Sequence, residues 1–372
     1  MLNNLNYLLT ITKKYNIVSI SLHRFRYSGE NMDSMALYYP DGHQKHYLYA
    51  HPESPERVEV IKRGLMEIGL WDGYPQVSPL ELDKTLLEAV HDQNYLNILE
   101  RTSRQAQSLD PDTYTTLQSW QLALNAAGGG VSIADLVWDR KVGSGFALTR
   151  PPGHHATRNR GMGFCLINNV AVAAEYLLQV KGAKKIGILD LDLHHGNGTQ
   201  DIFWERPDVC YISIHQAPFY PGTGALYETG SGAGEGTTLN LPIPRFSGDK
   251  AYTTLTRDII LPYLEEQKTD MLLISYGFDT HWKDPLGSMQ VSGDCIFEIM
   301  SDLKIWTEEH CSGRLAVFLE GGYDLEAGFS CGQAVGAALS NIKWEDSLGK
   351  SPAVEKDDWN ETLFEAKDLL KY

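Results

Sequence analysis

The stretch Lys185-Ile-Gly-Ile-Leu-Asp-Leu-Asp-Leu-His-His-Gly-Asn-Gly-Thr-Gln200 decides how this chain folds. Residues 185–189 are typical of a short strand buried on both faces, and polar residues begin where that strand should end. Because side chains alternate along an extended segment, Asp190, Asp192 and His194 are expected on one side, opposite the leucines between them. Asp192 and His194 can together bind one divalent ion, and the Gly-Asn-Gly turn that follows lets the backbone approach closely. The alternative is a strand end whose polar residues are solvated or cap a helix.

The composition is that of a globular protein. A chain of 372 residues with 42% hydrophobic content can bury a large core, in one large α/β domain or two ordinary ones. The sequence contains no run of about 18 apolar residues, so no membrane-spanning helix is expected. Five cysteines without a Cys-x-x-Cys pair argue against a disulfide framework and a cysteine-based zinc site. A reducing, intracellular compartment is therefore expected.

The net charge constrains the partners. A formal charge of -16 disfavours direct binding to nucleic acid, which requires a basic surface. The same charge would attract cationic substrates such as lysine-rich segments or polyamines.

The first 34 residues differ from the rest, with four basic residues but no Asp or Glu before Glu30. Such a leader is typical of an organellar transit peptide, and it lacks the positive start and small-residue cleavage site of a secretory signal. Equally, Met32 or Met35 could be the true start. We expect an N-terminal extension at residues 1–34, disordered, targeting or wrongly assigned, and one catalytic domain at 35–372. The location would be cytoplasmic, or organellar if the extension is a transit peptide.

Strand and helix patterns alternate along the second half, which predicts a mainly parallel sheet with helices on both faces. Ser54 and Pro55 suggest an N-cap and first helical position. The glycines at 128–130 favour close helix packing over phosphate binding, because no Lys-Ser/Thr follows, and residues 230–236 are expected to be a mobile loop. Strands are predicted at 36–39, 142–148, 185–191, 209–214, 271–276 and 315–319, and helices at 58–70, 80–99, 117–138, 168–180, 249–266, 293–310 and 326–340, with a last packing helix through Trp359, Leu363 and Leu370.

Four polar segments follow predicted strands, and ligands in such folds collect at the carboxyl ends of the strands. These segments are 150–155, 190–195, 276–279 and 320–323. Asp279 supplies a third ligand beside Asp192 and His194, and three protein ligands with open positions are the pattern of a catalytic zinc site. Iron or another divalent metal is the alternative.

Five motifs occur together: Arg-Pro-Pro-Gly-His-His at 150–155, the Asp-Leu-Asp-Leu-His-His-Gly-Asn-Gly-Thr-Gln run at 190–200, Pro-Gly-Thr-Gly at 221–224, Gly-Phe-Asp-x5-Pro-Leu at 277–286 and Glu-Gly-Gly-Tyr at 320–323. They resemble the motifs of the histone deacetylase family, from about Tyr38 to Leu339. The resemblance implies the arginase/deacetylase α/β fold in a single three-layer domain. It is greatest to class II-like members, the bacterial-type deacetylase-like amidohydrolases and acetylpolyamine amidohydrolases.

The resemblance also implies an activity and its metal ions. The expected reaction is zinc-dependent hydrolysis of acetyl-lysine or related acetylated amines, with one zinc held by Asp192, His194 and Asp279. Potassium is a further expectation from resemblance, at Asp190, Asp192, His194, Ser213 and Ile214.

Catalytic roles follow from the same resemblance. His154 would pair with Asp190, His155 would be the general base and acid, and Tyr323 would hold the oxyanion. The chemistry agrees, because a metal ion must polarise the amide and acidify water, while His155 moves the proton. Tyr323, on a flexible Gly-Gly hinge, would supply the second oxyanion donor.

Asn197 stands where class I enzymes have Asp and so resembles the class II pattern. If it partners His155, that imidazole lacks a nearby negative charge, and its proton affinity should be lower than that of His154.

The pocket walls are also expected from resemblance. Gly163, Phe164 and Tyr220 would line a tunnel for the aliphatic stem of acetyl-lysine, although both aromatics could instead be core residues. Leu286 occupies a rim position where polyamine-preferring relatives have Glu, and an apolar rim favours acyl-lysine. Arg57 resembles an arginine below the metal that helps acetate leave, or it is a surface helix charge.

Four hypotheses remain at this stage. The first is a zinc deacetylase of acetyl-lysine in proteins or peptides, and the second is an acetylpolyamine or other small-amide deacetylase. The third is a ureohydrolase with two manganese ions, of which only one ligand set is visible. The fourth is a non-catalytic acyl-lysine reader, which would be expected to lack His155 or Tyr323, and both are present.

Overall fold

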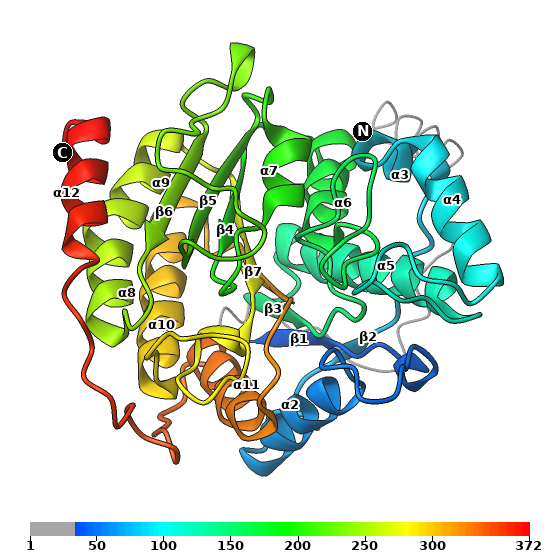
Figure 1. Cartoon of the computed structure of the whole chain (residues 1–372), viewed down its shortest axis with the longest axis horizontal. Coiled ribbons are helices and arrows are strands. Elements are labelled where there is room, and N and C mark those ends of the chain that lie inside the picture. Colours follow the sequence, from blue (N-terminus) through cyan, green and yellow to red (C-terminus); the bar gives the residue numbers. More distant parts are fainter. Residues whose placement is uncertain (1–33) are drawn as a thin grey trace, which may run out of the picture.

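The computed structural model describes residues 34–372, so the N-terminal extension expected from the sequence lies almost entirely outside the described residues. Within the described part, one all-parallel sheet runs in the order β2-β1-β3-β8-β7-β4-β5-β6 (Figure 1). The strands are β1 Met35–Tyr38, β2 Gln76–Val77, β3 Ser144–Ala147, β4 Ile186–Asp190, β5 Val209–Gln216, β6 Thr238–Ile243, β7 Met271–Tyr276 and β8 Leu315–Leu319.

Helices cover both faces of this sheet (Figure 1). One face carries α2 Glu56–Glu67, α8 Asp249–Leu255, α9 Leu261–Gln267, α10 Gly293–His310, α11 Leu325–Leu339 and α12 Asn360–Leu370. The other carries α3 Lys84–Val90, α4 Gln93–Arg104, α5 Ser119–Trp138, α6 Asn169–Tyr176 and α7 Asn197–Phe203.

The central strands divide their side chains between two hydrophobic clusters. In β4, Leu189 joins the cluster under α10 and α11, whereas Ile188 joins the one under α5 and α6. In β8, Val317 and Phe318 divide in the same way. Burying each such side chain contributes about 1.5–3 kcal/mol, which explains why these strands are apolar runs rather than alternating patterns. The predicted three-layer α/β fold is confirmed.

Several local predictions were wrong. The helix predicted at 80–99 is two helices, because His91 and Asp92 are extended and His91 is fixed by hydrogen bonds to Thr157 O and Asn168 N. The edge strands β2 and β6 and helix α7 were missed, and β6 contains Pro242, which is unfavourable in a central strand. Helix α2 begins at Glu56, with Pro55 rather than Ser54 at the N-cap position.

The glycines of α5 lie where no side chain fits. A Cβ at Gly128 would be 2.2 Å from the Leu80 carbonyl oxygen, and one at Gly129 would be 2.3 Å from the Tyr38 ring. The prediction of close helix packing is therefore confirmed.

The glycine-rich loop at 230–236 contains a 3-10 turn, Gly232–Gly234. This turn follows Ser231, whose N–H donates to Trp204 O at the end of α7.

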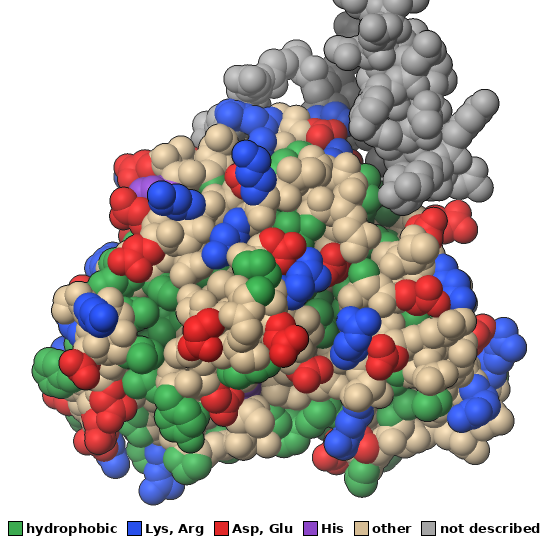
Figure 2. All heavy atoms as spheres, turned by 90° about the horizontal axis from the view of Figure 1, so that it is seen from above, with side chains coloured by type: hydrophobic (Ala, Val, Ile, Leu, Met, Phe, Trp, Pro, Cys, Tyr) green, Lys and Arg blue, Asp and Glu red, His purple; other side chains and the backbone are tan. Residues whose placement is uncertain are grey.

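Two global features bear on possible partners. No helix of residues 34–372 has the length and apolar character needed to cross a bilayer. On the face shown in Figure 2, Lys and Arg side chains are interspersed with Asp and Glu and do not gather into a basic patch.

Candidate metal centre and catalytic site

Three ligand-type side chains converge at the carboxyl ends of β4 and β7. Donor atoms of Asp192, His194 and Asp279 all lie within 4.8 Å of one another. His194 Nδ1 is 3.1 Å from Asp192 Oδ1 and 3.3 Å from Asp279 Oδ2. Both carboxylates are fully buried, and the His194 side chain is 12% exposed. Two carboxylates and one imidazole are a donor set that divalent metals accept.

The surroundings of these ligands also fit a cation. Asp279 Oδ2 is buried, and its 3.3 Å contact with His194 Nδ1 lacks hydrogen-bond geometry, so this oxygen has no hydrogen-bond partner among the described residues, although buried polar atoms normally have one. A Cβ at Gly277 would come within 2.1 Å of Asp192 Oδ2, and one at Gly321 within 2.3 Å of Asp279 Oδ2. Glycines are therefore required where the backbone passes the carboxylates.

The two buried carboxylates of the cluster, Asp192 and Asp279, are unfavourable next to each other unless a positive charge compensates them. Burial and the Asp192 carboxylate raise the pKa of Asp279. Burial lowers the pKa of His194, but its contacts with Asp192 and Asp279 outweigh this and raise it to about 9. Two buried carboxylates this close repel each other, and a bound divalent ion would offset both charges.

Two histidines lie beside the cluster, with ring centroids 4.0 Å apart. His154 Nδ1 is 3.0 Å from Asp190 Oδ2, and His155 Nδ1 is 2.8 Å from Asn197 Oδ1, so both pairings expected from sequence are present. Burial lowers the pKa of His154, yet Asp192 and Asp190 raise it to about 10. Burial, His154 and His194 lower the pKa of His155 well below its usual value. The predicted order of proton affinities is the one found.

Tyr323 is held on a braced loop rather than a free hinge. Gly321 N donates to Asp192 Oδ2 at 2.8 Å, which ties the loop to a ligand of the cluster. Gly322 has φ +109°, and a Cβ there would be 2.3 Å from the Phe278 ring. The glycines thus serve close approach and an unusual backbone angle, not the flexibility expected from the sequence. Burial raises the pKa of Tyr323 well above its usual value, so the phenol remains a donor.

The expected tunnel residues Gly163, Phe164 and Tyr220 come together around His155. The Tyr220 ring lies 5.2 Å from the His155 ring, and a Cβ at Gly163 would be 2.5 Å from His155 Cδ2. Phe164 faces the Tyr323 ring edge-on at 5.8 Å. Tyr220 is 42% exposed and Phe164 is half-buried, so neither is a core aromatic, and their role as tunnel walls stays a prediction. Leu286 is 37% exposed, on the loop that follows Asp279.

Comparison with known proteins agrees with this geometry. The histone deacetylase domain model matches residues 51–339, which include every residue described above. The chain belongs to the histone deacetylase family. It is 40% identical to histone deacetylase 14, chloroplastic, of Arabidopsis thaliana over 82% of this chain and 75% of that protein.

Two further relatives of this deacetylase extend the comparison. A probable deacetylase of Archaeoglobus fulgidus is 40% identical over 74% of this chain and 77% of that protein. The crystal structure of the HDA15 HD domain superposes with a TM-score of 0.83 at 34% identity, covering 92% of this chain and 95% of that one. The family assignment supports a deacetylase, a hydrolase of acetylated substrates.

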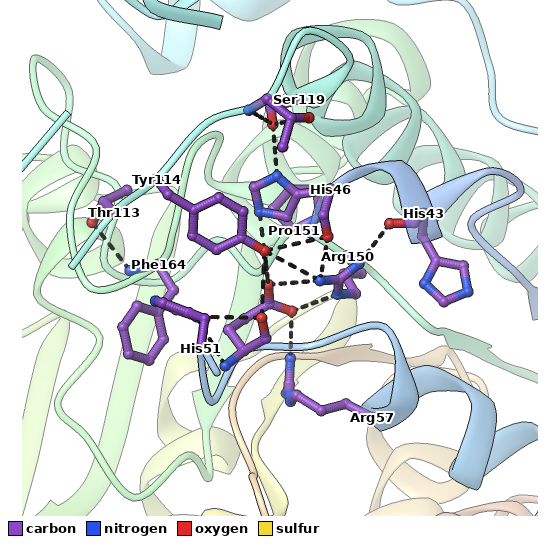
Figure 3. Close-up of polar contacts among 12 residues, drawn as sticks. His43, His46, His51, Arg57, Thr113, Tyr114, Ser119, Arg150, Pro151 and Phe164 are labelled. Atoms are coloured by element: carbon purple, nitrogen blue, oxygen red, sulfur yellow. Dashed lines mark hydrogen bonds and ion pairs between the residues drawn. The ribbon is translucent and has the colours of Figure 1, made fainter. Parts of the chain in front are cut away.

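Two buried arginines of this deacetylase, Arg57 and Arg150, lie close together (Figure 3), and both pair with the buried carboxylate of Glu53. Arg57 Nη1 is 3.1 Å and Arg150 Nε is 2.6 Å from Glu53 Oε1. Burial raises the pKa of Glu53, but Arg150 and Arg57 lower it to about 2. Arg57 also donates to the backbone carbonyls of Gly322 and Glu320, so it is not a surface charge.

No role for Glu53 or Arg150 was predicted, because charged side chains are normally exposed unless paired. The available signal was the Glu53-x-x-x-Arg57 spacing, which places both side chains on the same side of a helix start. Arg150 had no comparable signal, since its partners come from residues about 100 positions away.

The residues expected at a potassium site also lie together in this deacetylase. Asp190, the last residue of β4, is the register partner of Ser213 inside β5, and Ile214 is next along β5. Ser213 Oγ lies 2.9 Å from His215 Nδ1. The arrangement groups Asp190, Asp192, His194, Ser213 and Ile214 at one edge of the sheet, and occupancy by potassium remains a prediction.

Proposed function

We propose that this protein is a zinc-dependent amidohydrolase that removes acetyl groups from acetyl-lysine in proteins or peptides. The observation that carries the proposal is the buried cluster of Asp192, His194 and Asp279, with Asp279 Oδ2 left without a hydrogen-bond partner among the described residues. The His155 ring lies 5.8 Å from the His194 ring, and the loop that carries Tyr323 is bound to Asp192 through Gly321 N, so both groups that amide hydrolysis needs come from segments next to the cluster.

Asp192, His194 and Asp279 would hold the zinc ion. When bound, it would polarise the amide carbonyl and lower the pKa of the attacking water. His155 would take the proton of that water and return it to the leaving amine. With Nδ1–H directed to Asn197 Oδ1, the His155 Nε2 lone pair is the free base.

The remaining side chains would stabilise the reaction. Tyr323 would donate its phenolic proton to the oxyanion of the tetrahedral intermediate. His154, kept protonated by Asp190 and Asp192, would add positive charge next to His155 and keep the proton affinity of that base low.

The substrate class follows from the walls and the charge. Tyr220, beside His155, and Phe164, beside Tyr323, would form an aromatic passage suited to an aliphatic stem, and Leu286 adds no carboxylate at the rim. An acidic protein attracts the basic residues that surround lysines in many substrates. Two of the similar proteins are named histone deacetylases, a name that implies acetylated lysine in a protein as the substrate. This supports acetyl-lysine over acetylpolyamine.

An assay of four substrates would test the proposal. The purified full chain is incubated with an acetyl-lysine peptide, a free acetyl-lysine derivative and acetylputrescine, and with a guanidine compound that a ureohydrolase would cleave. Each is measured before chelation, after chelation and after zinc is added back. We expect deacetylation of the peptide, its loss on chelation and its return with one zinc per chain. Preference for acetylputrescine would make this a polyamine deacetylase, and two bound metals with guanidine hydrolysis would indicate a ureohydrolase.

The location of the protein is a separate proposal. We propose an intracellular enzyme whose residues 1–34 direct it to an organelle, because two similar plant proteins are named chloroplastic. A reporter fused behind residues 1–34 should enter an organelle, and a reporter that stays in the cytoplasm would contradict this.

A further inference from the structure

One buried carboxylate outside the metal ligands holds the loop that carries Tyr323. Asp284 Oδ2 accepts hydrogen bonds from Tyr323 N at 2.6 Å and from Asp324 N at 3.1 Å. Asp284 Oδ1 accepts a third, from Leu286 N at 2.9 Å. The residue is 6% exposed, so these contacts are screened little by solvent.

Asp284 connects two segments that are distant in sequence. Its own backbone N–H donates to His281 O, in the loop that begins at Asp279. That loop is tied to the start of α10 by Trp282 N donating to Val291 O at 3.0 Å. The other segment runs through Tyr323 to Asp324, the N-cap of α11. The carboxylate therefore sets how far Tyr323 lies from the segment that supplies Asp279.

A second support acts on the opposite side of the same loop. The guanidinium of Arg57 donates to Gly322 O and Glu320 O, while Asp284 accepts from the N–H of the next residue. The peptide unit that joins Gly322 to Tyr323 is thus held at both its carbonyl and its N–H. With both ends held, the direction in which the phenol leaves the backbone is restricted.

We propose that Asp284 is a positioning residue for the oxyanion donor. Its carboxylate holds the backbone of Tyr323 so that the phenol reaches the reacting carbonyl while Leu286 stays at the rim. The inference rests on the proposed function, because a positioned phenol matters only if an oxyanion forms. Burial and Asp279 raise the pKa of Asp284 to about 7, and its three N–H donors act in the opposite direction.

Substitution by Asn is informative because of its hydrogen-bonding groups. An Asn side chain offers one oxygen and one NH2 group, so it cannot accept from Leu286 on one side and from Tyr323 and Asp324 on the other. Asp346→Asn is a matched control, since Asp346 accepts from Gly293 N, Leu348 N and Ser330 Oγ but makes none of its recorded hydrogen bonds to the Tyr323 loop.

The test is a double-mutant cycle with the zinc-loaded full chain and an acetyl-lysine peptide. We expect Asp284→Asn to lower kcat about 10- to 100-fold with little change in KM, as misplaced catalytic groups do. Tyr323→Phe should lower kcat about 100- to 1000-fold. The double variant should equal Tyr323→Phe within about twofold, because the phenol that Asp284 positions is already absent. Asp346→Asn should keep wild-type kcat.

Hydrogen–deuterium exchange gives a readout that needs neither metal nor activity. The amides of Tyr323 and Asp324 should be protected in the wild type and in Asp346→Asn, and exchange faster in Asp284→Asn. Fast exchange in the wild type would refute the contact itself.

Three other results would overturn the positioning role. The first is an unchanged kcat in Asp284→Asn. The second is a kcat in the double variant that is lowered by the product of the two single-variant factors. The third is that Asp284→Asn fails to fold while Asp346→Asn folds. If the wild type hydrolyses no acetylated amine while the amide protection is present, the proposed function fails and not the contact.

Discussion

At the residue scale, the two adjacent histidines of the site, His154 and His155, differ in the groups that their imidazoles contact. His154 has two carboxylates within 3.7 Å, whereas His155 has the neutral amide of Asn197. The pKa of His154 is therefore raised and that of the neighbouring His155 is lowered, and pairs of titratable groups separated in this way are typical of acid–base sites.

Replacing Asn197 by Asp should change the pH dependence of the reaction. A carboxylate beside His155 favours its protonated form and raises its pKa. Because the base must be unprotonated, the acidic limb of kcat/KM should move to higher pH. Measurement of kcat/KM from pH 5 to 9 tests this, with Asn125→Asp on α5 as a control that should leave the profile unchanged. An identical profile for Asn197→Asp would show that Asn197 does not act through His155.

Replacing Glu53 by Gln should destabilise the protein. Two buried arginines would lose their shared counter-charge, and breaking such a buried pair typically costs about 3–5 kcal/mol. Urea unfolding at pH 7 measures the loss, and Glu100→Gln, in an exposed pair with Arg104, should change stability by less than about 1 kcal/mol.

The Glu53 effect should also depend on pH. The folded-state pKa of about 2 lies below the ordinary Glu pKa of 4.5, so the contribution is present above pH 4.5 and is lost as pH falls toward 2. The difference between wild type and Glu53→Gln should therefore shrink over that range. A constant difference would assign the destabilisation to packing.

At the element scale, helix α5 approaches the sheet closely because three successive residues lack a side chain. Gly129→Ala would place a Cβ 2.3 Å from the Tyr38 ring. Overpacking of this kind costs about 1–3 kcal/mol, more than the roughly 1 kcal/mol that Ala gains over Gly in a helix. Thermal unfolding should show a lower Tm for Gly129→Ala, and Gln121→Ala on the exposed face of α5 should leave it nearly unchanged. A raised Tm for Gly129→Ala would mean that Tyr38 moves aside without strain.

At the scale of the whole molecule, segments that follow four strands meet at the carboxyl ends of the sheet, and a bound ion would join two of them, those after β4 and β7. Metal removal should therefore lower Tm, because a ligand at 100 times its Kd stabilises the folded state by about 2.7 kcal/mol. Differential scanning calorimetry with zinc, with chelator and after add-back measures the shift. Asp279→Asn should lose most of it, whereas a full shift in that variant would place the metal elsewhere.

The sequence alone predicted the fold class and the grouping of Asp192, His194 and Asp279, which the structure places together. An apolar run followed by Asp-x-Asp-x-His is a local pattern, and a strand buried on both faces requires that run wherever it occurs. The same holds for Asn197, whose identity in the motif predicted its pairing with His155.

Only the tertiary structure decided which charges are buried and what they hold. Arg57 contacts Gly322 across 265 residues, and the helix break at His91 depends on Thr157 and Asn168. In the sequence, Asp284 cannot be distinguished from an ordinary loop residue. Its contact with Tyr323 exists only because the segment bearing Tyr323 folds against it. Burial and partners of this kind depend on which distant segments pack together. A periodicity or a motif within one segment does not contain that information.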